Sequence, residues 1–303
     1  MSTRRIETPE FSWDSCCSDQ GTRLRRALEE DGFAVIRGLL SVTEIDRLRA
    51  IVRDHLVRRG VCFGLGKSQP NAAVVVPQLG FVFANHNVVR LFKTILGEDQ
   101  VVFTGHCDIH MNMLSGWHKD SGEAFGGYFH GDYFAASECR VYKIAVYLQN
   151  SDVRAGFAIR PGSHRSPAII CGDEVPIETR IGDVVVFDVR VSHAGQLPDL
   201  VEKGLKALNS LFTRGDRTKP DSRLVGALKA LYWKLVRRRE RLSVFFTFGC
   251  PNEYTYDFAC ANMARQTRQA GSADTKLPGE LTAQLLALGV TPYDVSMHAR
   301  RAS

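Results

Sequence analysis

The feature that most constrains the fold is a change of pattern near Val101, where helical periodicity gives way to closely spaced short strands. Strand-like runs separated by turn residues follow at 101–114, 139–149, 156–160, 183–192 and 242–249. Short strands at this density are typical of a sandwich or a barrel. Helices precede the strands without regular βαβ alternation, which disfavours a doubly wound parallel sheet.

The first hundred residues are predicted to be mainly helical. Residues 22–31 form one helix that stops at Gly32, and the apolar run 33–36 that follows reads as a strand. Ser41 and Glu44 form a capping box, so a second helix starts there and ends at Gly60. Residues 61–85 are rich in glycine and predicted to be irregular, and a further helix spans 88–96.

The strand pattern is interrupted between residues 196 and 240. Ser222 is a candidate cap for a helix whose leucines fall on one face: Leu224, Leu228, Leu231 and Leu235. We interpret this stripe as packing rather than as a partner site. After residue 250 we expect a polar loop near 267–280 and a short helix around 280–288.

A single domain over residues 1–303 accounts for these elements. It has an N-terminal helical layer at about 20–97, a β core at about 98–250, and a helical insertion at about 196–240. The sequence contains no G-x-G-x-x-G or Walker motif, which disfavours the common nucleotide-binding folds.

The composition limits which binding partners and which cellular compartment are expected. The formal charge of +6 fits an acidic small substrate as well as nucleic acid. None of the eight cysteines forms a C-x-x-C pair, and the first twenty residues lack the apolar region of a signal peptide. No run approaches the roughly 20 apolar residues that span a bilayer. We therefore expect a cytoplasmic protein with reduced thiols and no membrane partner.

Three H-x-D patterns offer candidate metal ligands: His106–Asp108, His118–Asp120 and His130–Asp132. Two imidazoles and one carboxylate can hold Fe(II) on one face, leaving positions for a chelating 2-oxo acid and for dioxygen. His106 and His110 share one face of a strand but lie roughly 13 Å apart, too far to bind one ion. His118 and Asp120 directly follow a strand, where they would reach a barrel mouth.

Later strands offer candidates for the third metal ligand and for a residue that binds the oxo acid. The run from Gly182 to His193 is predicted to be one strand whose inward face ends in His193, which suits a distal metal ligand. Arg241 and Ser243 share a face at the start of another strand, and an arginine can grip a carboxylate with two hydrogen bonds. Arg214 and Arg217 are alternatives to Arg241. His110 and Asn112 are candidates for the pocket wall, with a solvent-facing stripe as the alternative.

In this order, the residues resemble the phytanoyl-CoA dioxygenase-like (PhyH) family of Fe(II)/2-oxoglutarate-dependent oxygenases. The matching segments cover most of the chain: 30–40 with the capped helix after it, Trp117–Asp120, the P-G-S-H turn within 156–164, 182–193, and 241–243. The resemblance implies a mainly β fold with flanking helices (α+β), built on a double-stranded β-helix (jelly-roll, cupin-like) core.

The resemblance also implies the site. His118, Asp120 and His193 would hold Fe(II), Arg241 with Ser243 would bind the far carboxylate of 2-oxoglutarate, and His164 would be structural. In the family the arginine follows the distal histidine after about a dozen residues, whereas here 47 residues intervene, which we attribute to the insertion. Related halogenases carry a small residue at the position of Asp120, so halogenation is disfavoured.

The implied activity is oxidation of an unactivated C–H bond of a small organic molecule, such as an intermediate of specialised metabolism, with release of succinate and CO2. Hydroxylation, desaturation, cyclisation and epimerisation are all compatible. The alternatives are a non-catalytic metal- or ligand-binding jelly-roll protein and an oxygenase acting on nucleic acid. The second is disfavoured because the basic run from Lys234 to Arg241 is explained as a solvated helix face.

Overall fold

The computed structural model describes residues 8–13, 18–121, 129, 131–151, 157–216, 219–270 and 274–294. Its helices are α1 (Ser18–Glu30), α2 (Val42–Arg59), α3 (Ala72–Val75), α4 (Gly80–Phe83), α5 (His86–Leu96), α6 (Leu200–Thr213), α7 (Arg223–Leu235), α8 (Glu253–Ala270) and α9 (Gly279–Ala287). Its strands are β1 (Glu10–Ser12), β2 (Phe33–Arg37), β3 (Val61–Phe63), β4 (Gly66–Gln69), β5 (Val101–Met111), β6 (Val141–Tyr147), β7 (Phe157–Ile159), β8 (Val175–Ile177), β9 (Val184–Asp188), β10 (His193–Ala194), β11 (Leu242–Gly249) and β12 (Val290–Pro292).

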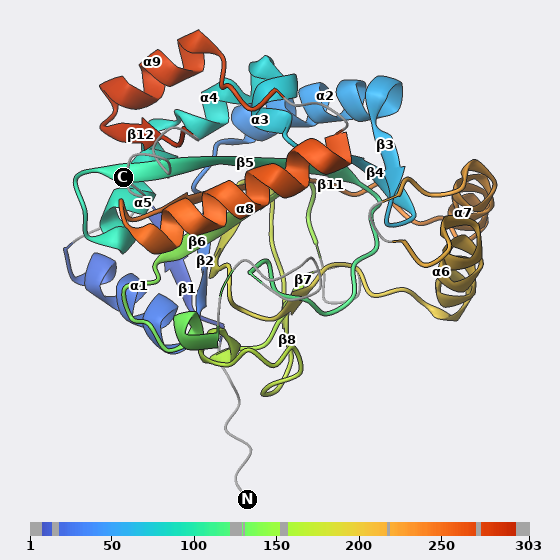
Figure 1. Cartoon of the computed structure of the whole chain (residues 1–303), viewed down its shortest axis with the longest axis horizontal. Coiled ribbons are helices and arrows are strands. Elements are labelled where there is room, and N and C mark those ends of the chain that lie inside the picture. Colours follow the sequence, from blue (N-terminus) through green and yellow to red (C-terminus); the bar gives the residue numbers. More distant parts are fainter. Residues whose placement is uncertain are drawn as a thin grey trace, which may run out of the picture.

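Two sheets of unequal size form the core (Figure 1). The large sheet has the order β1-β2-β9-β6-β11-β5-β4-β3, with β12 paired to β5, and the small sheet has the order β10-β7-β8. An antiparallel bridge between His118 and His193 adds a further segment to the small sheet. From β5 to β11 the chain passes repeatedly between the two sheets, with the pair β7 and β8 consecutive in the small sheet, and this winding confirms the predicted jelly-roll core.

The two faces of the large sheet have different partners. One face packs beneath α1, α2, α3, α5 and α9 in the largest apolar cluster, which includes Phe83, Phe103 and Phe248. The other face packs against the small sheet through residues such as Phe187 and Phe157. Helix α8 lies along β5 and closes the side of the sandwich that the small sheet leaves uncovered (Figure 1).

Local signals placed several elements correctly. The Ser41 hydroxyl accepts from the Glu44 amide and the Glu44 carboxylate accepts from the Ser41 amide, so the predicted capping box exists. Helix α5 ends at Gly97, whose left-handed φ of 68° favours glycine. Strand β11 spans the residues predicted for it.

Several expectations were wrong. The run 183–193 is not one strand: β9 ends at Asp188, and His193 belongs to β10 of the other sheet. The chain turns this corner because the Asp188 carboxylate accepts from both the backbone amide and the guanidinium of Arg190. Residues 61–85, expected to be irregular, contain β3, β4, α3 and α4, and residues 267–270, expected in a loop, end helix α8.

The leucine stripe on α7 does not pack against the rest of the protein, which corrects another expectation. Leu224, Leu228, Leu231 and Leu235 are 40–73% exposed, while the opposite face of the helix buries Val225, Lys229 and Trp233. Ser222 does precede the helix, but its side chain makes no capping hydrogen bond.

Candidate metal centre

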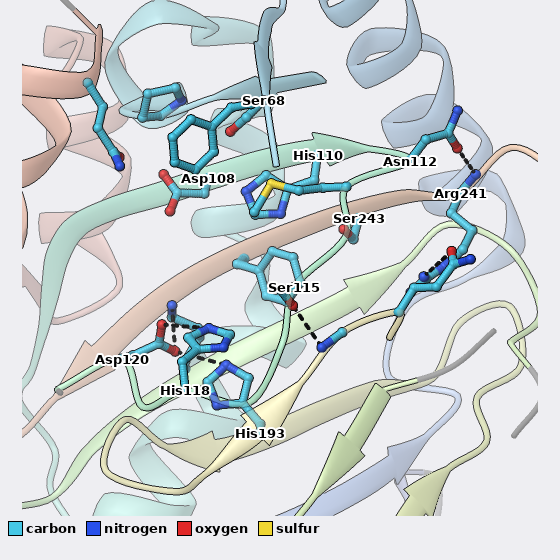
Figure 2. Close-up of a pocket in the computed structure, with 18 of the residues that line it drawn as sticks. Ser68, Asp108, His110, Asn112, Ser115, His118, Asp120, His193, Arg241 and Ser243 are labelled. Carbon is cyan, nitrogen blue, oxygen red and sulfur yellow. Dashed lines mark hydrogen bonds and ion pairs between the residues drawn. The ribbon is translucent and has the colours of Figure 1, made fainter. Parts of the chain in front are cut away.

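The antiparallel bridge that adds the His118 segment to β10 of the small sheet brings the three predicted metal ligands together (Figure 2). The His118 amide donates to the His193 carbonyl at 3.0 Å, and the His193 amide donates to the His118 carbonyl at 2.9 Å. Nε2 of His193 lies 3.5 Å from Oδ2 of Asp120, and Nε2 of His118 lies 4.0 Å from Oδ1. One donor atom from each residue falls within 4.8 Å of the others, so the triad can hold one ion.

Backbone carbonyls orient both imidazoles. Nδ1 of His118 donates to the Gly116 carbonyl at 2.8 Å, and Nδ1 of His193 donates to the Val191 carbonyl at 3.1 Å. A neutral imidazole that donates from Nδ1 carries its lone pair on Nε2. Both Nε2 atoms therefore face Asp120 as acceptors, as metal binding requires.

The charges around Asp120 and His193 favour the protonation states in which these side chains can bind a metal ion. Burial alone would raise the pKa of Asp120, but Lys143, His193 and His118 hold that pKa far below its usual value. The Lys143 ammonium is 2.7 Å from Oδ2 of the carboxylate. Burial, reinforced by His118 and Lys143, lowers the pKa of His193 to about 3, which keeps this ligand neutral. Two imidazole nitrogens and one carboxylate on one face fit Fe(II) with open positions.

The triad lines one cavity together with every other predicted site residue. The cavity measures about 140 Å³, and its wall includes Arg241, Ser243, His110 and Asn112 (Figure 2). Ser243 is paired in register with His110 on one side and Tyr147 on the other. The triad and the basic end of the cavity thus belong to one continuous space.

Arg241, the residue directly before β11, is fixed in place by hydrogen bonds. Its amide donates to Oδ1 of Asn112 at 2.8 Å, and the Asn112 amide donates back to its carbonyl at 2.9 Å. Its guanidinium donates to Oε1 of Gln196 at 2.8 Å and lies 5.9 Å from the centre of the Tyr147 ring. Arg214, by contrast, is exposed at the end of α6 and does not line the cavity, and Arg217 lies outside the described residues.

The wall contributed by α8 was missed from the sequence. Arg265 donates to Oδ2 of Asp108 at 3.0 Å, and Gln266 donates to Oδ1 at 2.8 Å. Burial opposes ionisation of Asp108, but Arg265 and His106 hold its pKa well below the usual value. Asn262 and Gln269 also line the cavity. The alternating stripe 106–112 contained Asp108, but the helix that completes the wall was not predicted.

The other H-x-D patterns have different environments. His106 and Asp108 are 1% and 7% exposed, so the solvent-facing alternative for this stripe is wrong at these positions. Burial lowers the pKa of His110 to about 4 and leaves its ring neutral in the cavity wall. His130 lies outside the described residues.

Two buried side chains brace the segment that carries the candidate metal ligands. Lys119, between the two ligands, donates to the carbonyls of Ser163 at 2.6 Å and Arg190 at 2.7 Å. His164 accompanies Ser163 in the P-G-S-H turn and donates from Nε2 to the Glu29 carbonyl at 3.1 Å. These bonds join the ligand segment, the turn after β7 and the corner before β10.

Acidification is expected to destabilise the protein through His106. Its folded pKa is lowered to about 4, chiefly by burial, whereas the unfolded residue takes up a proton near 6.5. This stabilisation is present above about pH 6.5 and declines by up to about 1.4 kcal/mol per pH unit as the pH falls towards 4. Urea unfolding at pH 7 and pH 5 checks it: His106→Gln should lose part of the pH dependence, and the exposed-site variant His86→Gln should retain it. Equal pH dependence in the wild type and His106→Gln would contradict the assignment.

Comparison with known proteins agrees with this geometry. A family model described as phytanoyl-CoA dioxygenase (PhyH) matches residues 28–196, which include the triad but not Arg241. No curated protein sequence matches the chain significantly. None of the helices in the described ranges is long and apolar enough to cross a membrane.

Solved structures share the fold at low sequence identity. The non-heme alpha ketoglutarate dependent epimerase SnoN from nogalamycin biosynthesis is 15% identical with a TM-score of 0.52, the match covering 77% of this chain and 84% of SnoN. The carbocyclase SnoK from the same biosynthesis is 14% identical with a TM-score of 0.52, covering 80% and 87%. AviO1 from Streptomyces viridochromogenes Tue57 is 16% identical with a TM-score of 0.50, covering 78% and 97%.

Proposed function

The chain belongs to the phytanoyl-CoA dioxygenase family, and from this premise we propose that it is an Fe(II)- and 2-oxoglutarate-dependent oxygenase acting on a small organic molecule. The observation that carries the proposal is the shared cavity: an inward-facing His–Asp–His triad at one end and a positioned arginine at the other. His118, Asp120 and His193 are the proposed iron ligands. Arg241 and Ser243 are the proposed contacts for the far carboxylate of 2-oxoglutarate.

The residues present fit both groups. When bound, iron and 2-oxoglutarate supply activation of dioxygen for oxidation of a C–H bond, with release of succinate and CO2. The chain's own contribution is to hold the ligands and exclude water. Lys143 keeps Asp120 ionised, and the aromatic side chains of Tyr147, Phe157 and Phe245 line the cavity around the triad. Aromatic walls of this kind limit the access of water and protect a reactive centre from competing reactions.

The cavity wall also favours a class of substrate. Beside the apolar surface it presents neutral polar groups: His110, Ser68, Asn262 and Gln269. Such groups orient hydroxyl or amide functions without requiring a charge on the substrate. We propose a hydroxyl- or amide-bearing natural-product intermediate, a class that also suits a fold shared with the biosynthetic enzymes SnoN and SnoK.

The proposal is tested by anaerobic reconstitution with Fe(II) followed by 2-oxoglutarate. We expect the weak visible charge-transfer band of a chelated oxo acid, and then succinate release when air and a substrate from a natural-product panel are added. Protein reconstituted with Zn(II) is the matched control and should show neither. Stoichiometric Fe(II) without the band would overturn the oxygenase assignment and favour a metal-binding jelly-roll protein.

A further inference from the structure

A two-helix hairpin stands apart from the catalytic body. Helices α6 and α7, within residues 197–240, lie together at one edge of the molecule, beyond the end of the sheets (Figure 1). Trp233 and Val225 pack against Leu65 and Leu114 of the body. Buried Lys229 donates to the carbonyls of Leu65 and Asn112. The hairpin is therefore firmly anchored through one face only.

All of the chain's net charge resides in this hairpin. Residues 197–240 contain eleven Lys and Arg against five Asp and Glu, a net charge of +6. Because the whole chain also carries +6, the remaining sequence is electrically balanced. The hairpin is thus the one strongly cationic segment of the sequence.

All five of its acidic side chains have partners within the hairpin or at its base. Asp216 pairs with Lys219 at 3.6 Å, and Glu240 pairs with Arg53 of α2 at 3.0 Å. The Asp199 carboxylate accepts from Tyr232 at 2.8 Å and from Arg238 at 2.7 Å. Glu202 is fully buried and accepts from Trp233. Asp221 accepts from the Leu65 amide at 2.6 Å. The outward surface is consequently dominated by cations, namely Lys203, Arg214, Arg223, Lys234, Arg237 and Arg239.

The same surface exposes an unusual amount of apolar side chain. In the described part of the chain, ten of the fifteen large exposed hydrophobic residues lie in the hairpin: Leu197, Leu200, Val201, Leu211, Phe212, Leu224, Leu228, Leu231, Leu235 and Val236. Leu200 is 84% exposed and Leu211 is 77% exposed. Single exposed leucines need no explanation, but a concentration of this kind marks an interaction surface.

We propose that the hairpin docks on the surface of a lipid bilayer that carries anionic headgroups. Lys and Arg beside exposed Leu, Val and Phe on anchored amphipathic helices are the composition of helices that lie in a membrane interface. The aliphatic side chains enter the headgroup boundary and the cations pair with anionic lipid. Our sequence-based expectation of no membrane partner considers spanning segments, and surface docking needs none.

A second copy of the chain, another protein or a nucleic acid would fit this surface less well. Apposing two copies through this face would bring a charge of +6 against +6, which opposes a symmetric dimer. Protein interfaces are enriched in aromatic residues and methionine, whereas the large exposed hydrophobic side chains of this surface are aliphatic apart from Phe212. Nucleic acid would use the cations but leave the leucines exposed to water.

Docking through the hairpin would also fix the position of the cavity relative to the membrane. Pro220, exposed between α6 and α7, lines the cavity together with Val61 and Phe63 of the neighbouring strand β3. The hairpin thus reaches the cavity rim. A molecule held on a membrane by this surface would keep that rim beside the lipid.

Flotation of the full-length protein with large unilamellar vesicles tests the proposal. Vesicles of phosphatidylcholine with roughly 30% phosphatidylglycerol should carry the protein, and vesicles of pure phosphatidylcholine should not. Binding should weaken as NaCl rises from about 0.05 to 0.5 M, because the electrostatic part is screened. Arg237→Glu/Arg239→Glu and Leu211→Glu/Leu235→Glu should each lower the partition coefficient by about tenfold or more.

Matched controls alter exposed residues elsewhere. Arg23→Glu/Arg59→Glu changes the charge equally, and Val57→Glu/Leu286→Glu replaces side chains that are 55% and 56% exposed. Both should bind vesicles like the wild type. Failure of the wild type to float with anionic vesicles would overturn the proposal, as would retention of binding by the leucine variant. A dimer in sedimentation that Leu211→Glu dissociates, or displacement from vesicles by duplex DNA regardless of the leucines, would assign the surface to those partners instead.

Discussion

Replacing His193 with alanine is expected to abolish stable Fe(II) binding and, with it, all 2-oxoglutarate turnover. The imidazole supplies one of three donors, and its Nε2 lone pair already faces the Asp120 carboxylate at 3.5 Å. Free energies of about 10–16 kcal/mol for four-ligand metal sites imply roughly 3 kcal/mol per ligand, so affinity should fall by about 100-fold or more. Anaerobic titration with Fe(II), together with the oxo-acid charge-transfer band, measures the loss.

The substitution also removes a buried side chain, so folding has to be followed separately. Circular dichroism and thermal unfolding of the metal-free protein serve that purpose, and His118→Ala, whose side chain is 25% exposed, provides a second ligand variant with less disturbance of the core. His86→Ala, at an exposed position on α5, is the matched control and should bind Fe(II) normally. Tight Fe(II) binding by both folded ligand variants would disprove the triad.

Arg241→Ala should raise the KM for 2-oxoglutarate by roughly 30-fold to several thousand-fold and change kcat far less. The guanidinium lines the same cavity as the triad, and loss of one partner from a buried charge pair costs about 2–5 kcal/mol. Arg241→Lys keeps the charge but not the paired donors, so it should recover only part of the affinity. Steady-state succinate formation against 2-oxoglutarate concentration gives both constants.

Arg214→Ala is the control for this experiment, because that arginine also follows the distal histidine in the sequence but lies outside the cavity. Its KM should equal that of the wild type. If Arg214→Ala raised the KM and Arg241→Ala did not, the proposed oxo-acid contact would be misplaced.

The elements that were predictable are those set by neighbouring residues. The capping box at Ser41 and Glu44 and the glycine after α5 act over one turn of helix, so a sequence window contains the whole signal. The alternation that marks β11 is equally local. The triad was predictable for a different reason: H-x-D after a strand narrows the candidates, and the family resemblance selects among them.

Elements that depend on distant contacts escaped prediction. The chain between Phe187 and His193 reads as one strand, yet it turns from one sheet into the other at Arg190. The Arg190 guanidinium is fixed there by distant carbonyl groups, those of Tyr133, Ala136 and Cys139. Helix α8 has polar residues on the face that meets the cavity, including Arg265 and Gln269, so its pattern lacks a clear apolar stripe. Lys143 gains its partner Asp120 only when the two sheets meet.

The hydrogen bond between Arg241 and Gln196 has a consequence for insertions in this fold. These two residues bracket the hairpin, so the segment between them leaves the barrel and returns at nearly the same point. The entropy of closing a loop grows only with the logarithm of its length, and each doubling adds about 0.6 kcal/mol. Connections of very different length can therefore present the arginine at the same place. In chains of this architecture, the sequence separation between distal histidine and arginine measures how much has been inserted rather than how far apart the two side chains stand.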